Sequence, residues 1–382
     1  MNKWADKYII GLTGNIGTGK SVVRRMLEHL GAYGIDADAL AHRALASDGP
    51  GFGPVTDTFG KFLLTPEGQI DREKLGRIVF NDPEALGRLE SILHPLVEQA
   101  VDLIVRRATH KVIVVEAIKL LESELFDQCD AIWVVFSPPE MQLSRLVQNR
   151  KMNPQDAQRR IDSQVPQESR LAGASVVIKN ISSIEETWKQ VTAAWQRYVV
   201  PSGDGHQSVP LSPPVKLNLG EVNIQRAGPK QVEEIVETIN RLNKNRTPVN
   251  RSEIMAEFGE KAFLLLKIGE NPMGILGWQV ENLVARTSDI LLDSALAPVQ
   301  YLPILIREME KSSIDLQCEI SIIYVPIHLS HHDVLWNRLG YEKRAPALLG
   351  VSAWQEAAEE SIPEGTVLFF KQLRQDRVLR PI

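Results

Sequence analysis

Cysteine is nearly absent from this sequence of 382 residues, which contains only Cys129 and Cys318. The two cysteines lie far apart, and neither belongs to a C-x-x-C motif. This scarcity argues against a fold held together by disulfides or by a cysteine-bound zinc ion. It also fits a reducing compartment, so we expect a cytoplasmic protein.

Long hydrophobic runs and a strong excess of one charge are also lacking. The opening residues are polar, and the apolar run after them, at 8–12, has only the length of a strand. We therefore expect neither a signal peptide nor a membrane span. The formal net charge is −5, so no general attraction to nucleic acid or to an anionic membrane is predicted. Small molecules are the expected partners, and the oligomeric state is left open.

The length of 382 residues allows two or three domains. Residues 201–219 are rich in proline, glycine and serine, which is typical of a linker. We predict one domain at 1–200, this linker, and a second domain at 220–382.

The first domain carries a glycine-rich motif, G-x-x-x-x-G-K-S, at residues 14–21. It follows the apolar run at 8–12 and precedes a segment with helical spacing at 22–30, which is the strand–loop–helix setting that a phosphate-binding loop requires. Lys20 supplies a cation for the β- and γ-phosphates of a nucleoside triphosphate, and Ser21 supplies a hydroxyl for Mg²⁺. The expected nucleotide-binding residues of this loop are Gly14, Asn15, Gly17, Thr18, Gly19, Lys20, Ser21 and Val22.

Carboxylates follow two predicted strands. Residues 32–38 end in Asp36 and Asp38, and the strand at 112–116 ends in Glu116, where a Walker-B-type acid would stand. In open α/β sheets, ligands bind beyond the carboxyl ends of the strands. Two interpretations of Asp38 stay open: a general base that takes a proton from an acceptor hydroxyl, or the N-cap of the next helix.

After a predicted loop at 49–54, helical segments dominate to about residue 109 and predict a helical subdomain inserted between strands. Asp71 is expected to cap a helix at 72–80, and Pro83 to start another. Residues 92–96 are expected to break that helix. His94, within the break, is either a substrate contact or a packed histidine.

Further strands are predicted at 131–136 and 175–180, with a closing helix at 184–198. Between them lie two short helices, at 141–151 and 154–161, that carry Arg145, Arg150 and Arg160. Arginine binds phosphate oxygens bidentately, so beside a phosphate-binding loop these helices are typical of a mobile kinase lid, although a solvated basic face is the simpler alternative.

Together these features resemble dephospho-CoA kinase over about residues 7–200. The resemblance is carried by residues 12–21, 35–38, 71–72 with 79–80, 93–95, 120–122, 142–145, 160–161 with 164, and 177–178 with 180. It implies a three-layer P-loop kinase with a five-stranded parallel sheet, a CoA-binding helical subdomain and an ATP lid. The implied reaction is phosphorylation of the ribose 3′-hydroxyl of dephospho-CoA by ATP and Mg²⁺.

The resemblance also assigns roles to single residues. Asp38 matches the family's base, and Lys20 and Arg145 match its phosphate-stabilising residues. The remaining expected contacts are Arg150 and Asn180 for ATP, and Asp36, Asp38, His94, Glu116 and Arg160 for the substrate. One departure is Lys119, in a segment where many members carry Asp-x-Pro-Leu. Another P-loop small-metabolite or nucleotide kinase is the alternative function.

The second half predicts an α+β domain with the order strand, helix, three strands, helix, strand, helix, strand. The expected elements are 222–226, 229–242, 262–268, 274–280, 289–296, 301–311, 320–325, 330–339 and 366–371. With the Arg-Leu-Gly-Tyr-Glu stretch at 338–342, this order resembles the GNAT-type acyltransferase fold.

That family binds the acyl-CoA pyrophosphate on a Q/R-x-x-G-x-G/A turn at a helix start, and residues 300–305 depart from this pattern. Pro303 has no N–H to donate, and Leu305 is expected to crowd the phosphate. We therefore expect a degenerate domain that folds on its own and is non-catalytic or regulatory. A bifunctional kinase–acyltransferase is the alternative.

Overall fold

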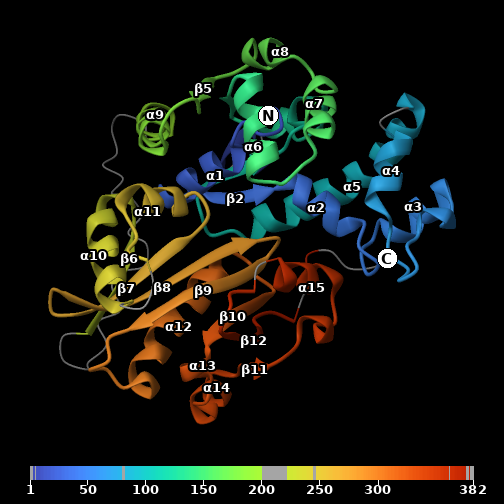
Figure 1. The fold of residues 1–382 in the computed structure, drawn as a ribbon. Helices are drawn as coiled ribbons and strands as arrows, with labels where there is room; N and C mark the ends of the chain where they lie inside the picture. The colour runs from blue at the N-terminus through green and yellow to red at the C-terminus, as the bar shows by residue number, and fades with distance from the viewer. Residues whose placement is uncertain are drawn as a thin grey trace. The chain divides into compact units, whose positions relative to one another are not determined.

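The computed structural model describes residues 3–4, 6–79, 82–199, 222–243, 247–360, 362–375 and 378. The chain forms two compact units (Figure 1). Unit 1 comprises Met1–Asp38, Thr109–Pro213 and Arg251–Glu260, and unit 2 comprises Ala39–Ala108, Pro214–Asn250 and Lys261–Ile382. Each unit therefore takes residues from both halves of the sequence. The predicted linker at 201–219 lies outside the described residues, and the predicted domain boundaries stay a prediction.

Unit 1 is built on a parallel sheet with the strand order β2-β3-β1-β4-β5. Its strands are β1 (Tyr8–Thr13), β2 (Tyr33–Asp36), β3 (Val112–Glu116), β4 (Ala131–Phe136) and β5 (Val176–Lys179). Strands β1, β3 and β4 are apolar and almost wholly buried, as parallel strands covered on both faces must be. The predicted five-stranded parallel sheet is confirmed.

Helices cover this sheet and complete unit 1. They are α1 (Lys20–His29), α6 (Pro139–Gln148), α7 (Pro154–Asp162), α8 (Gln167–Leu171), α9 (Ile184–Tyr198) and α11 (Arg251–Glu257), with 3₁₀ turns η2 (Leu120–Glu122) and η3 (Phe126–Gln128). Leu27 of α1, Trp133 of β4 and Val191 of α9 are fully buried in one cluster. Helices α1 and α9 therefore pack on the strands that lead to the candidate site.

The helical insertion belongs to unit 2. It contains most of α2 (Ala37–Ala44), followed by α3 (Phe52–Phe59), η1 (Lys61–Leu63), α4 (Arg72–Val79) and α5 (Pro83–Arg107). The Asp71 carboxylate accepts a hydrogen bond from the Lys74 amide at 3.0 Å, which confirms the predicted cap. The Asp82 side chain caps α5 in the same way.

The predicted break at residues 92–96 is wrong, because α5 continues through Pro95. Proline removes one helical hydrogen bond, which usually kinks or ends a helix. Here Leu93 and Val97, on either side of the proline, are both 8% exposed and pack into the core. Burial of this apolar face offsets the lost hydrogen bond and keeps the helix continuous.

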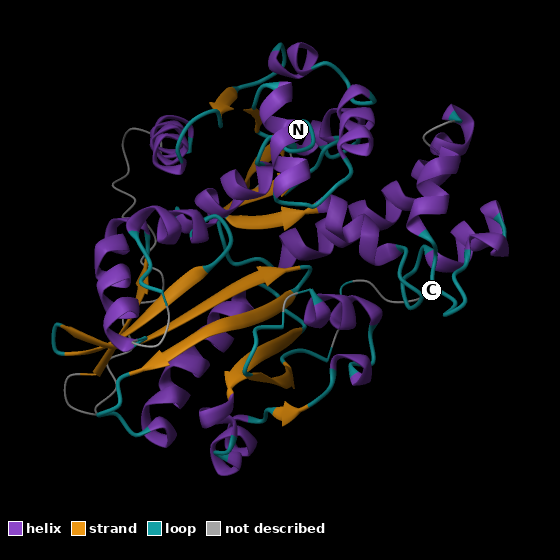
Figure 2. Ribbon diagram, viewed as in Figure 1, coloured by secondary structure: helices purple, strands orange, loops and turns teal. Residues whose placement is uncertain are grey.

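The rest of unit 2 is a mixed sheet with the order β11-β12-β10-β9-β8-β7-β6, in which β8 and β9 lie side by side (Figure 2). Its strands are β6 (Val222–Ala227), β7 (Ala262–Ile268), β8 (Asn271–Glu281), β9 (Val284–Leu292), β10 (Ile320–Pro326), β11 (Glu342–Lys343) and β12 (Thr366–Gln372). Its helices are η4 (Pro229–Gln231), α10 (Val232–Leu242), α12 (Pro298–Asp315), α13 (Ile327–Ser330), α14 (Asp333–Leu339), η5 (Pro346–Leu348) and α15 (Ser352–Glu359).

The predicted order of strands and helices in the second half is confirmed, with local corrections. Strand β9 begins at Val284, earlier than predicted, because Asn282 and Leu283 adopt left-handed backbone angles and close a tight β8–β9 turn. Helix α14 begins at Asp333, so Ser330 is not its cap, whereas Gly340 ends it with φ 78° as predicted. Helices α11 and α15 were not predicted. No helix among the described residues is long and apolar enough to cross a membrane.

Candidate active site

The glycine-rich loop connects β1 to α1 and needs its glycines. Gly14, Gly17 and Gly19 have φ angles of 151°, 75° and 90°. A Cβ atom on Gly14 would lie 2.4 Å from the Val135 carbonyl oxygen, and one on Gly19 would lie 2.2 Å from the Asn180 amide nitrogen. The loop can therefore pack against the ends of β4 and β5 only without side chains at these positions.

Helix α1 starts at Lys20, and within the described part of the chain no side chain caps its N-terminus. The amide groups of a first helical turn lack partners inside the helix. Together with the positive end of the helix dipole, these amides form a site that suits a polyphosphate. The residues present therefore fit the triphosphate of ATP.

Lys20 is 7% exposed, and its Nζ donates to the Asn15 carbonyl at 3.3 Å. Burial lowers the pKa of this lysine, while Glu116, Asp38 and Asp36 oppose that effect. The lysine thus stands within electrostatic reach of all three predicted carboxylates. A compact cation in a partly dry site is well suited to charge on a transferring phosphoryl group.

Asp38 lies inside the first turn of α2, which begins at Ala37. Its Oδ2 accepts a hydrogen bond at 3.1 Å from the amide of Ile118, which lies two residues after the end of β3. The N-cap interpretation of Asp38 is therefore wrong. Burial raises the pKa of Asp38 to about 6, with Lys20 opposing and Asp36 reinforcing the shift. A carboxylate with this pKa can accept a proton near neutral pH.

Ser21 and Glu116 meet at the end of β3. The Ser21 hydroxyl donates to Glu116 Oε1 at 3.0 Å, and Arg24 Nε donates to Oε2 at 2.7 Å. Glu116 is 3% exposed, and the Arg24 guanidinium is the cation paired with its carboxylate. A hydroxyl beside a carboxylate oxygen is a donor set that suits Mg²⁺.

Arg145 extends from α6 onto the loop. Its Nη1 donates to the carbonyls of Gly17 and Thr18, both at 3.2 Å, and its Nη2 donates to the Asn180 carbonyl at 2.9 Å. The Asn180 side chain in turn donates to the Thr18 carbonyl at 2.9 Å. Burial lowers the pKa of Arg145. The structure therefore brings both predicted residues to the loop, with the Arg145 guanidinium bonded to backbone carbonyls.

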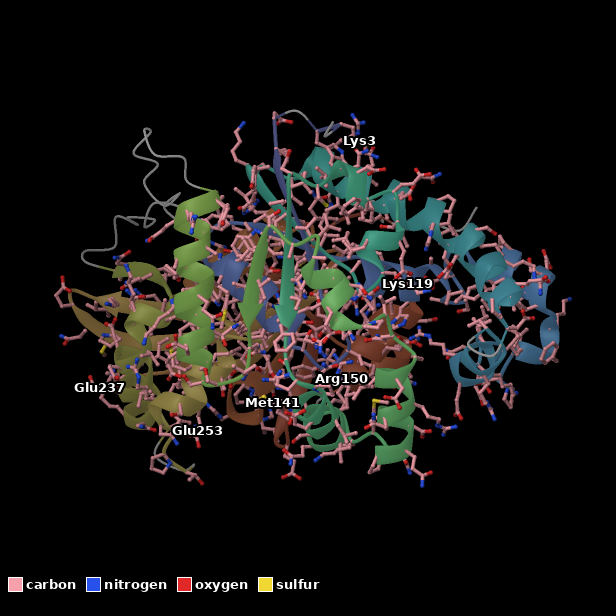
Figure 3. The ribbon with its side chains drawn as sticks, turned by 90° about the horizontal axis from the view of Figure 1, so that it is seen from above. Lys3, Lys119, Met141, Arg150, Glu237 and Glu253 are labelled. Atoms are coloured by element: carbon pink, nitrogen blue, oxygen red, sulfur yellow. The ribbon has the colours of Figure 1, made fainter. Side chains whose placement is uncertain are left out.

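The other predicted residues are less closely joined to the loop. Arg150 is exposed in the connection between α6 and α7 (Figure 3), near enough to Lys20 to act on its pKa. Arg160 is exposed on α7, and Asp36 is half-buried at the end of β2. His94 is half-buried in α5 of unit 2. Lys119 lies 4.0 Å from Glu122 in an exposed ion pair (Figure 3).

Arg24 and a second buried arginine of this site were missed by the sequence interpretation. Arg170 of α8 is 2% exposed. Its Nε donates to Asn15 Oδ1 at 3.0 Å, and its Nη1 donates to the Ile118 carbonyl at 2.7 Å. It therefore joins the phosphate loop to the same peptide segment that binds Asp38. Burial identifies Arg170 in the structure, but no pattern in the sequence around its five-residue helix predicts that burial.

The predicted acyl-CoA turn differs from expectation. Helix α12 already begins at Pro298, so residues 300–305 lie within it, and Leu305 is fully buried in the core of unit 2 instead of facing a phosphate. The crowding argument is wrong. The helix start nevertheless offers few donors, because Pro298 has no N–H and the amides of Gln300 and Tyr301 donate to the Ala297 carbonyl at 3.0 and 3.2 Å.

A parallel sheet, a glycine-rich loop entering a helix, a buried lysine and facing carboxylates define the fold and site of a P-loop kinase. The dephospho-CoA kinase family model matches residues 8–186. The chain is 40% identical over 194 residues to the dephospho-CoA kinase of Geobacter metallireducens, which covers 50% of this chain and 96% of that protein. It is 42% identical over 193 residues to that of Carboxydothermus hydrogenoformans, covering 50% and 94%. The chain belongs to the dephospho-CoA kinase family.

The second half also has similar structures. A GNAT-family acetyltransferase from Staphylococcus aureus Mu50 aligns with a TM-score of 0.32 at 12% identity, covering 40% of this chain and 99% of that one. The strand and helix order described above, and not this alignment, is the basis for describing the second half as GNAT-like.

Proposed function

We propose that this chain transfers the γ-phosphoryl group of ATP to the ribose 3′-hydroxyl of dephospho-CoA, giving CoA and ADP. The observation that carries the proposal is the meeting of Lys20, Asp38 and the Ser21–Glu116 pair beyond the carboxyl ends of β1, β2 and β3. Membership of the dephospho-CoA kinase family supports the choice of acceptor.

The proposed roles follow from the positions of these side chains. Asp38 takes the proton of the 3′-hydroxyl as the hydroxyl oxygen bonds to the γ-phosphorus and the bond from that phosphorus to ADP breaks. Lys20 stabilises the negative charge of the transferring group. Arg145 and Asn180 hold the loop carbonyls, which fixes the direction of the loop amides. Arg150, Arg160, Asp36 and His94 keep their predicted roles as ATP and substrate contacts.

We infer that Ser21, the predicted metal ligand, and Glu116, predicted as a substrate contact, would hold Mg²⁺, which would neutralise phosphate charge. Ser21 is exposed at the surface of the site, so its hydroxyl is available to a metal. Arg24 holds the Glu116 carboxylate in place through an ion pair at 2.7 Å. A cytoplasmic location remains our inference from the scarcity of cysteine.

The test is ADP release by the full chain with ATP, Mg²⁺ and dephospho-CoA. We expect turnover with dephospho-CoA and none above background with adenosine monophosphate or gluconate. Preferential turnover of either alternative acceptor would favour another P-loop small-metabolite kinase. Isolation of CoA carrying a 3′-phosphate would establish the position of transfer.

We further propose that the GNAT-like half does not transfer acyl groups. The support is the start of α12, where Pro298 and the internally bonded amides leave little to bind a pyrophosphate. Incubation of the full chain with acetyl-CoA and an amine acceptor, with ATP absent, tests this by measuring the acetylated product. Acetylation of an amine acceptor by the chain would show instead that it is a bifunctional kinase–acyltransferase.

A further inference from the structure

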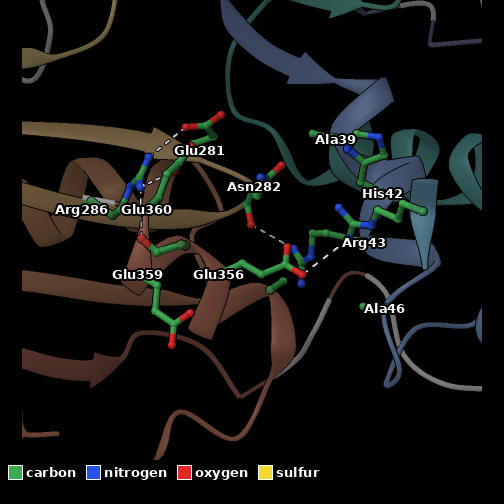
Figure 4. A pocket seen from close by; sticks show the side chains of 13 residues that line it. Ala39, His42, Arg43, Ala46, Glu281, Asn282, Arg286, Glu356, Glu359 and Glu360 are labelled. Atoms are coloured by element: carbon green, nitrogen blue, oxygen red, sulfur yellow. Dashed lines mark hydrogen bonds and ion pairs between the residues drawn. The ribbon is translucent and has the colours of Figure 1, made fainter. Parts of the chain in front are cut away.

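Unit 2 contains a buried ion pair between residues that lie 276 positions apart. Arg43, in the last turn of α2, donates from Nη2 to Glu319 Oε2 at 2.8 Å. Its Nη1 donates to the Asn282 carbonyl in the β8–β9 turn at 3.2 Å (Figure 4). The two side chains are 5% and 1% exposed. We call Arg43 and Glu319 the anchor pair.

Glu319 precedes β10, and both oxygens of its carboxylate accept hydrogen bonds. Besides Arg43, Oε2 accepts from the Trp354 indole at 3.3 Å, and Oε1 accepts from the Val378 amide at 3.0 Å. Arg43 is the cation that compensates this charge. A carboxylate taken out of water to this degree is costly without its cation, so the pair fixes where α2 lies on the sheet of unit 2.

Other contacts within unit 2 join the helical insertion to the same sheet. Gln317 Nε2 donates to the Ile104 carbonyl of α5 at 3.2 Å in a buried contact. The hydroxyls of Ser47 and Ser352 lie 3.0 Å apart. Beside the anchor pair is a cavity of ≈ 400 Å³ whose exposed rim includes Glu356 (Figure 4). The anchor pair is thus the fully buried part of a larger contact whose rim is in water.

Helix α2 makes this contact relevant to the kinase. Its first turn carries Asp38 and its last turn carries Arg43, within one continuous helix from Ala37 to Ala44. The two residues are five positions apart, about 7.5 Å along the axis at a rise of about 1.5 Å per residue. The rest of the insertion follows α2 and is, by resemblance, the part that binds the CoA moiety.

We propose that Arg43 and Glu319 are positioning residues for the kinase reaction: the GNAT-like half holds α2 through them, and so holds the acceptor side of the kinase in its working arrangement. This proposal rests on the proposed kinase function. It gives the second half a role that needs no acyl transfer.

The test compares full-length wild type with Glu319→Gln, Arg43→Gln, Arg43→Lys and the double variant Arg43→Gln/Glu319→Gln. The control is Glu356→Gln, which removes the exposed partner of Arg72, 3.6 Å away on the same side of unit 2. Circular dichroism melts first define a temperature at which every variant is folded. KM and kcat are then measured for dephospho-CoA and ATP separately.

We expect KM for dephospho-CoA to rise about tenfold in Glu319→Gln and in Arg43→Gln, a size usual for coupling between sites. KM for ATP should change less than twofold, because the anchor pair and its hydrogen-bond partners Asn282, Trp354 and Val378 belong to unit 2, whereas the phosphate loop belongs to unit 1. Arg43→Lys should recover part of the loss, and Glu356→Gln should match wild type. The double variant should be no worse than either single one, because the pair is already lost.

Should Glu319→Gln fail to fold, Arg43→Gln and the double variant carry the comparison. Unchanged KM for dephospho-CoA in folded variants, or an equal rise in KM for ATP, would overturn the anchor role. A wild-type chain without activity on dephospho-CoA would instead overturn the proposed function, so the two failures are distinguishable.

Discussion

Asp38 is the residue on which the proposed chemistry depends most. Replacing it with asparagine keeps the shape of the side chain but removes the proton acceptor. We expect Asp38→Asn to lower kcat by about 10²–10⁴, the usual loss for a general base, while ATP binding stays close to normal. Single-turnover kinetics and a nucleotide titration test this, with exposed Asp127→Asn as the control. Activity above about half of wild type would remove Asp38 from the mechanism.

The pKa of Asp38 also predicts a pH profile. Since burial raises that pKa to about 6, the carboxylate is mostly ionised above pH 6 and mostly protonated below it. We expect kcat/KM for dephospho-CoA to be level above that point and to fall about tenfold per pH unit below it. The folded chain binds this proton more tightly than the unfolded chain, so the same group favours folding more as the pH falls. A profile level down to pH 5 would contradict the assignment.

Lys20 and Ser21 are adjacent, but their substitutions should act differently. Lys20→Ala removes a cation from the transferring group, and raised Mg²⁺ cannot replace it. Ser21→Ala removes one proposed metal ligand while Glu116 remains, so higher Mg²⁺ should restore part of its activity. Activity measured across a Mg²⁺ series distinguishes them. An identical Mg²⁺ dependence in both variants would refute the proposed division of roles.

At the scale of single residues, the sequence predicted the loop and its carboxylates because they stand in local patterns: a motif, or the end of an apolar strand. Arg170 and the anchor pair were not predictable in this way. Each contacts residues more than a hundred positions away, and nothing in their neighbouring sequence distinguishes a buried arginine from a solvated one.

Among the elements, helix α5 contradicts a predicted break in its interior. Pro95 lies in its interior, where a missing hydrogen bond and a steric conflict typically cost about 3 kcal/mol. Pro95→Ala should therefore raise the free energy of unfolding, by up to that amount, as a higher urea midpoint. Pro139 begins α6, where proline costs little, so Pro139→Ala is the matched control and should leave the midpoint nearly unchanged. A lower midpoint for Pro95→Ala would show that the helix is adapted to its proline.

Strands β3 and β4 and helix α9 lie at the predicted residues, since each has a complete apolar pattern of its own. The elements that were missed are short. Helices α11 and α15 have seven and eight residues, and their positions depend on the surfaces they pack against. Strand β9 was placed too late because Asn282 and Leu283 do not form a recognisable glycine turn.

For the whole molecule, the units suggest that the second half is not independent of the first. In a separate piece spanning residues 220–382, the Glu319 carboxylate would lose Arg43 while keeping Trp354 and the Val378 amide as possible donors. We expect Glu319→Gln to stabilise that piece by about 1–3 kcal/mol while it destabilises the full chain. Urea unfolding of both, with and without the substitution, tests this reversal of sign. The same sign in both would show that the carboxylate does not depend on Arg43.

Because each unit takes segments from both halves of the chain, the order of synthesis constrains the order in which the units can complete their folding. Helix α11 joins unit 1 although it is synthesised after the strands it accompanies, with His29 of α1 bonded to the Phe258 carbonyl that follows it at 3.2 Å. The helical insertion depends on a segment that is synthesised later still, since 276 residues separate Arg43 from Glu319. At roughly 5–20 residues per second, translation of this stretch takes roughly 14 to 55 s. During it, the nascent insertion lacks its final neighbour and is exposed to chaperones and proteases on the ribosome.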